Sequence, residues 1–107
     1  MKLVIKDKKI NILYANSFKL RFFGLMGKKK ITYGIFFPNC NSIHTFFMKD
    51  EIDIIMLNKN NQILYLYENF KKNHILYKKE AKHIIELPKG FIKKYKFKIN
   101  DYIKIVN

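Results

Sequence analysis

The sequence predicts a mostly β fold, a sandwich-like or barrel-like single domain of about eight short strands with one short helix near its start. Short apolar runs recur along the 107 residues and are separated by turn sequences rich in Asn, Lys, Pro and Gly. Hydrophobic residues make up 49% of the chain and aromatic residues 16%, which supports a packed core. A chain of this length fits one domain, so we treat residues 1–107 as a single unit.

The first elements are a β-hairpin and a helix. Leu3–Ile5 and Ile10–Tyr14 are strand-like runs around the turn Asp7–Lys9. Asn16 or Ser17 can cap a helix that we expect over residues 17–26. Its apolar stripe has helical spacing and is followed by a glycine suited to a helix end, the residues being Phe18, Phe22, Leu25 and Gly27.

Strand patterns dominate the rest of the chain. Gly34, inside the first of them, predicts a bulge or a close approach of two backbones. We expect a β-meander from the second, third and fourth strands, and one helical turn at Phe91–Tyr95. The predicted strands are Thr32–Phe37, Ile43–Met48, Ile52–Leu57, Gln62–Tyr67, Ile75–Tyr77, His83–Leu87 and Tyr102–Val106.

The net charge of +14 has two interpretations. Of 22 basic residues only one is arginine, Arg21, and the abundant Lys, Ile and Asn all use A/T-rich codons. Nucleic-acid surfaces usually include arginine, because guanidinium binds phosphate in a bidentate manner. We therefore favour a solvated lysine surface, while binding of nucleic acid or another anionic surface stays an alternative.

Cys40 is the single cysteine, so no internal disulfide can form and a reducing compartment is expected. We see no signal peptide and no apolar window near the roughly 20 residues that span a bilayer. The sequence thus predicts a cytoplasmic protein, monomeric or weakly dimeric, with no cofactor.

Several motifs occur in order along the chain. They are Arg21-x-x-Gly24-Leu25-Met26-Gly27, Gly34-Ile35-Phe36-Phe37, Ile43-His44-Thr45-Phe46-Phe47-Met48, Ile52-Asp53 and Ile85-Glu86-Leu87-Pro88-x-Gly90. Over about residues 15–105 the chain resembles the domain-of-unknown-function family 192. The resemblance implies a β-sandwich or jelly-roll-like domain with one short helix, and no established activity, cofactor or catalytic residue. It also implies a Gly–Asp turn near the end, where this chain has Asn100-Asp101.

Two groups of residues could carry chemistry. Cys40 and His44 are weak candidates for nucleophilic catalysis or half a zinc site, but no second cysteine exists and we predict no metal. Arg21, Asp53 and Glu86 suggest a salt bridge from helix to sheet, because both carboxylates lie in apolar runs. In the alternative, Arg21 anchors an anionic ligand in a pocket floored by His44 and Asp53.

The absence of a complete catalytic set favours a non-enzymatic β domain that binds a partner protein or small ligand. A lysine-rich accessory to nucleic acid is the first alternative, and an enzyme that depends on Cys40 and His44 is the second.

Overall fold

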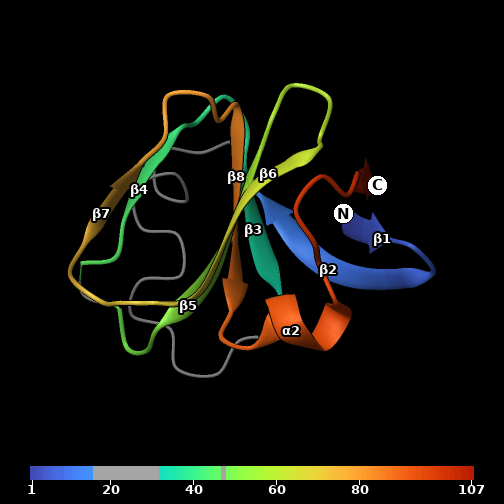
Figure 1. The fold of residues 1–107 in the computed structure, drawn as a ribbon. Coiled ribbons are helices and arrows are strands. Elements are labelled where there is room, and N and C mark those ends of the chain that lie inside the picture. The colour runs from blue at the N-terminus through green and yellow to red at the C-terminus, as the bar shows by residue number, and fades with distance from the viewer. Residues whose placement is uncertain (16–31, 47) are drawn as a thin grey trace.

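A seven-stranded sheet that curls into a half-barrel forms the centre of the molecule (Figure 1). The computed structural model describes residues 1–15, 32–46 and 48–107. The strands lie in the order β6-β5-β8-β3-β2-β1-β9. Their bounds are β1 Lys2–Ile5, β2 Lys8–Tyr14, β3 Gly34–Phe37, β5 Ile52–Leu57, β6 Ile63–Phe70, β8 His83–Pro88 and β9 Lys104–Val106.

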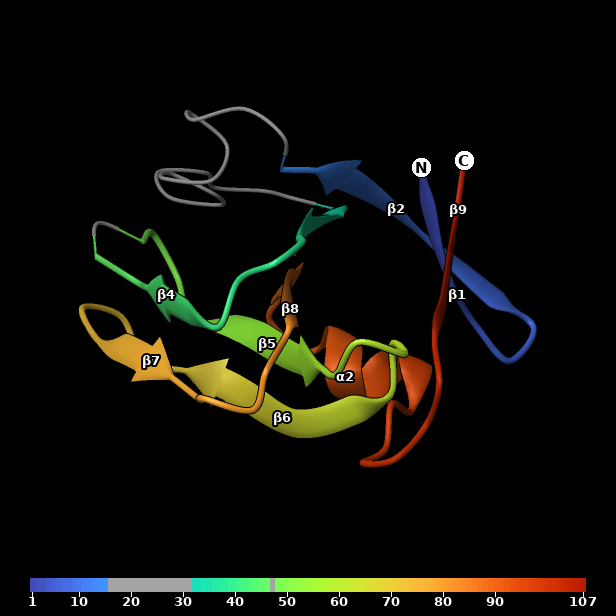
Figure 2. The same cartoon turned by 90° about the horizontal axis from the view of Figure 1, so that it is seen from above.

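A second sheet and a short helix complete the described structure. β4 (Ser42–His44) and β7 (Ile75–Tyr77) pair antiparallel on one side of the central strands. Helix α2 (Phe91–Tyr95) lies on the concave side of the curled sheet, as the view from above shows (Figure 2). All named strand pairs are antiparallel except β2 with β3, whose parallel pairing requires the crossover made by the chain between them.

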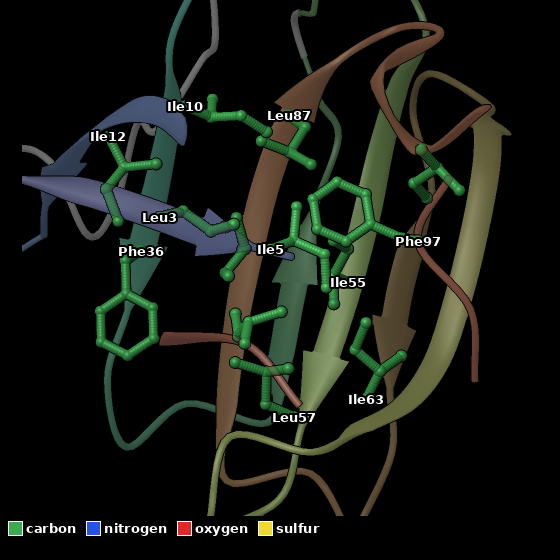
Figure 3. Packing of buried hydrophobic residues seen from close by; sticks show 13 residues of the cluster. Leu3, Ile5, Ile10, Ile12, Phe36, Ile55, Leu57, Ile63, Leu87 and Phe97 are labelled. Carbon is green, nitrogen blue, oxygen red and sulfur yellow. The ribbon is translucent and has the colours of Figure 1, made fainter. Parts of the chain in front are cut away.

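The concave face of the sheet holds the main core. Strands β1, β2, β5 and β8 send alternate apolar side chains into it (Figure 3). Ile92 enters from α2, and Phe97 enters from just beyond the C-cap of that helix, Lys96. Figure 3 shows Leu3, Ile5 and Leu87 pointing toward Ile55 and Phe97 across this space.

The opposite face of the same strands packs against the β4–β7 sheet. Ile54, Met56 and Ile84 lie in this second core, together with Leu76 from β7. β5 is buried along its whole length because it faces a core on both sides, which explains its nearly continuous apolar sequence.

The predicted mostly β class is confirmed, with the half-barrel as the observed form. The predicted strand at 43–48 is shorter than expected, since β4 ends at His44 and a turn follows. The predicted meander is wrong in part, because β4 pairs with β7 while β5 lies between β6 and β8. The predicted turn of helix at Phe91–Tyr95 is present, and the helix expected over 17–26 lies outside the described residues.

Gly34 marks a close approach of β3 to β8, one of the two readings of its position in the sequence. A Cβ atom at this residue would lie 2.6 Å from Leu87 Cδ2 and 2.9 Å from the carbonyl oxygen of Glu86. Both distances are shorter than real contacts, so glycine lets the two strands pair here without a shift of their backbone or side chains.

Candidate functional site

Asp53 is a fully buried carboxylate, and its hydrogen-bond partners in the described part of the chain are backbone amides. Its Oδ1 accepts the N–H of Asn69 at 2.9 Å, and its Oδ2 accepts those of Gly90 at 3.1 Å and Ile92 at 2.9 Å. The last two amides belong to the start of α2, where helix N–H groups lack internal partners. Asp53 thus fastens both the helix and strand β6 to the central strand β5.

Glu86 is also buried, at 3% exposure, but it points to the other face of the sheet. Its neighbours Ile85 and Leu87 both enter the concave core, so alternation along β8 places Glu86 in the second core, opposite Ile54 and Ile35. Asp53 lies beside Leu87 and faces the concave core. The two carboxylates are therefore not brought together.

Arg21 lies outside the described residues. A link from its guanidinium to Asp53 or to Glu86 stays a prediction. His44 belongs to β4 and is remote in the topology from the concave face where Asp53 lies.

Cys40 and His44 each make a local contact. The Cys40 thiol donates to the carbonyl oxygen of Ser42 at 3.1 Å, and the His44 Nδ1 accepts the N–H of Phe46 at 3.3 Å. The His44 ring also stacks on the Phe46 ring, with centroids 5.3 Å apart and planes 23° apart.

Thr45 is a polar residue in the same motif whose role the sequence analysis missed. It is 1% exposed, and its hydroxyl donates to the carbonyl oxygen of Lys71 at 2.7 Å and accepts the N–H of His74 at 2.9 Å. Thr45 therefore ties the end of β4 to the chain that enters β7. A buried threonine among aromatic residues is the signal that could have indicated this role.

An exposed apolar surface covers the outside of the β4–β7 sheet. Ile75 and Tyr77 are 68% and 58% exposed, and His44 lies opposite Ile75 in the pairing register. Phe46 joins them through its stack on His44. We call this the outer face; its residues are Ser42, His44, Phe46, Ile75 and Tyr77.

A hollow of about 310 Å³ opens where the β4–β7 sheet ends, close to the Tyr77 end of β7. Two chain segments form its walls, residues 39–41 and 79–82. The lining residues are Asn39, Cys40, Asn41, Lys79, Ala81 and Lys82. The hollow is therefore polar and basic, with a single thiol in its wall.

His83 holds one wall of this hollow in place through a hydrogen bond to Asn39. Its Nδ1 accepts the N–H of Asn39 at 3.1 Å, and its ring lies against Phe36 with centroids 5.4 Å apart. Burial lowers the pKa of His83 from its ordinary value of 6.5, and the positive charge of Lys82 lowers that pKa further.

Within residues 1–15, 32–46 and 48–107, no three His, Cys, Asp or Glu side chains gather in a way that could hold a metal ion. In the same described part of the chain, no helix has the length and apolar character that crossing a membrane requires.

Comparison with solved structures shows the same fold in two bacterial proteins. A protein of unknown function from Novosphingobium aromaticivorans superposes with a TM-score of 0.81 at 14% identity, covering 97% of this chain and 82% of that one. A putative transcription regulator from Sinorhizobium meliloti gives a TM-score of 0.82 at 16% identity, covering 96% and 89%.

Sequence comparison identifies archaeal relatives. A UPF0127 protein of Pyrococcus furiosus is 31% identical over 104 residues, which cover 92% of this chain and 90% of the relative. A UPF0127 protein of Thermococcus kodakarensis is 36% identical over 83% of this chain but only 60% of its own length. The family DUF192, described as an uncharacterized ACR, matches residues 1–105, and the chain therefore belongs to this family of uncharacterised proteins.

Proposed function

We propose that this domain binds an extended, acidic segment of a partner protein along the free edge of β7. The observation that carries the proposal is that β7 offers Ile75 and Tyr77 to solvent on a strand whose outer edge has no partner strand among the described residues. Exposed apolar side chains on an unpaired strand edge promote aggregation. Their presence on β7 therefore favours a role in binding another molecule.

The hydrogen bonds to β4 define which backbone groups are free. Lys78 donates its N–H to Asn41, and Thr45 donates to His74, so residues 74, 76 and 78 direct their backbone groups toward β4. By alternation, the N–H and C=O groups of Ile75 and Tyr77 point away from β4. A peptide strand added there would pair with both residues, as in other strand-addition complexes.

Charge defines the chemistry of the partner. Two lysines precede the strand, Lys71 and Lys72, and two follow it, Lys78 and Lys79. A segment with acidic residues at both ends and an apolar, β-branched centre would complement this arrangement. The net charge of +14 would also speed its approach.

Single-stranded nucleic acid is the second candidate, favoured by one observation. The stacked rings of His44 and Phe46 belong to the outer face, and bases can stack on exposed rings. Lysines also flank β7 in the sequence. However, Ile75 is more exposed than Tyr77 and Phe46 and is aliphatic, so it offers an apolar contact and no ring for stacking. A protein segment therefore fits the outer face better.

The proposal is tested by selecting binders from a random nonapeptide library on phage. We expect enriched sequences with acidic ends and Val, Ile or Thr at the centre. A selected peptide, titrated into ¹⁵N-labelled protein, should shift the amide signals of Ile75 and Tyr77. Its affinity should fall at least about tenfold in the double variant Ile75→Ser/Tyr77→Ser, the scale of two truncated apolar anchors.

The chain offers a matched control. Ile99 and Tyr102 are an isoleucine and a tyrosine with 49% and 61% exposure on another surface, so Ile99→Ser/Tyr102→Ser should leave the affinity unchanged. The proposal fails if no sequence is enriched, if both double variants bind alike, or if oligo(dT) binds this face more tightly than any selected peptide.

We further propose a cytoplasmic location and a monomer or weak dimer. The free thiol of Cys40 supports a reducing compartment. Cell fractionation and sedimentation velocity would test both; a membrane or extracellular fraction, or a tight oligomer, would contradict them.

A further inference from the structure

We propose that the hollow between residues 39–41 and 79–82 is a binding site for a small oxyanion, a carboxylate or phosphate group. The proposal concerns a site beside the docking strand and does not depend on peptide binding there. It gives a role to Cys40, Ala81 and Lys82, which the proposed function does not use, and it shares Lys79 with the charge pattern beside β7.

Backbone hydrogen bonds connect the two walls of the hollow and fix the spacing between them. The N–H of Cys40 donates to the carbonyl oxygen of Lys82 at 2.9 Å, and the N–H of Lys78 donates to that of Asn41 at 3.0 Å. The Asn39 N–H is held by the His83 ring, as described above. Because bonds at both ends connect the walls, the space is a built feature of the fold.

The turn at residues 78–82 is held firmly in place and forms one wall of the hollow, which is partly open to solvent. Ala81 is 7% exposed, and its N–H donates to the carbonyl oxygen of Lys78 at 3.0 Å, which forms the turn. The N–H of Lys82 donates to the carbonyl oxygen of Leu57 at 2.7 Å, which fixes the turn to the central sheet. A volume of about 310 Å³ lies at the lower end of the range for small-molecule sites, roughly 300–1,000 Å³.

The lining groups favour an anion. Two lysines and two asparagines can donate hydrogen bonds, and no carboxylate is among the lining residues. Glu80 is the acidic residue in the wall segment, but its carboxylate accepts the hydroxyl of Tyr65 on β6 at 3.0 Å. Lysine ammonium groups bind carboxylate and phosphate as point charges, and two of them facing one hollow reinforce each other.

Cys40 reports on this site because it is the only cysteine of the chain and lines the hollow. Its alkylation rate can be measured with iodoacetate, an anion, and with iodoacetamide, its neutral analogue. A basic hollow that binds oxyanions should concentrate iodoacetate near the thiol. We expect the ratio of the two rates to fall on the order of 3- to 10-fold in Lys79→Gln/Lys82→Gln.

A second pair of lysines gives the control. Lys93 and Lys94 lie in the last turn of α2, so Lys93→Gln/Lys94→Gln removes the same net charge elsewhere. This variant should keep the wild-type ratio. Urea unfolding of both variants confirms that they are folded, and the ratio itself is insensitive to changes that affect both reagents equally.

Protection experiments identify the anion. Sodium acetate and inorganic phosphate should each slow alkylation by iodoacetamide more than sodium chloride of equal ionic strength, and the stronger protector indicates the preferred class. The proposal is overturned if Lys79→Gln/Lys82→Gln leaves the ratio unchanged, if the control lowers it equally, or if neither acetate nor phosphate protects more than chloride.

Discussion

At the scale of single residues, Asp53 shows how backbone groups can satisfy a buried carboxylate. A carboxylate inside a protein needs hydrogen-bond donors, and the sequence suggested a guanidinium. Among the described residues, Asp53 receives three backbone N–H groups, from Asn69, Gly90 and Ile92, while its predicted link to Arg21 lies outside them. Its role is therefore to position backbone, and this role is sufficient to explain an aspartate in an apolar strand.

Replacing Asp53 by Asn should lower the free energy of unfolding by about 3 kcal/mol, since charge-assisted bonds are worth roughly 1.5–3 kcal/mol each. The amide has one oxygen, so its NH₂ group would face an N–H donor. Urea unfolding measures the change. Asp50→Asn is the control, because the exposed Asp50–Lys89 pair at 3.4 Å should contribute less than about 1 kcal/mol. Equal effects of the two substitutions would refute the role of Asp53.

His83 predicts how stability depends on pH. Burial lowers its folded-state pKa below 6.5, so the unfolded chain takes up a proton first as the pH falls. The free energy of unfolding should therefore decrease as the pH drops from 7.5 to 5.5. His83→Gln should flatten this slope, whereas the exposed-site control His74→Gln should retain it. Urea unfolding at pH 7.5 and 5.5 measures this dependence. If His83→Gln leaves the pH dependence of the unfolding free energy unchanged, His83 is not its source.

At the scale of elements, the contact of β3 with β8 depends on a missing side chain. Gly34→Ala must move either the Leu87 side chain or the backbone of Glu86, because an added Cβ would lie within 3.0 Å of both. We expect a loss of about 2–3 kcal/mol, typical of overpacking in a closed core. Thermal or urea unfolding would show it.

Gly90→Ala gives a useful comparison within the same chain. Gly90 caps α2 with φ of 91°, and nothing lies within 4 Å of an added Cβ, so only backbone strain of about 1–2 kcal/mol opposes the change. The Gly34 variant should be the less stable of the two. The opposite order would show that backbone conformation outweighs the close approach.

Asparagine serves the turns in the way glycine does elsewhere. In the described part of the chain, five of the seven non-glycine residues with positive φ are asparagines, Asn39, Asn61, Asn69, Asn73 and Asn100. Asparagine tolerates this conformation better than most residues with a side chain. Asn100, where the resemblance implies glycine, has φ of 75°. The abundance of asparagine, which is consistent with A/T-rich codons, thus also serves the turns that need a positive φ.

At the scale of the whole molecule, the excess positive charge opposes folding. The chain carries 22 basic and 8 acidic side chains, so most lysines have no acidic counterpart and added salt should mainly weaken their mutual repulsion. The urea midpoint should rise between 50 and 500 mM sodium chloride. A midpoint that falls would mean that attractive pairs dominate.

The sequence by itself determined the mostly β class, the bounds of β5, the turn of helix at Phe91–Tyr95 and the family, because these depend on local periodicity, turn residues and short motifs. Only the tertiary structure decided that β4 pairs with β7 and that Asp53 and Glu86 face opposite cores. It also decided that Asp53 binds amides 16 to 39 residues away. These outcomes depend on which faces of distant strands bury each other, and such pairings leave no local pattern in the chain.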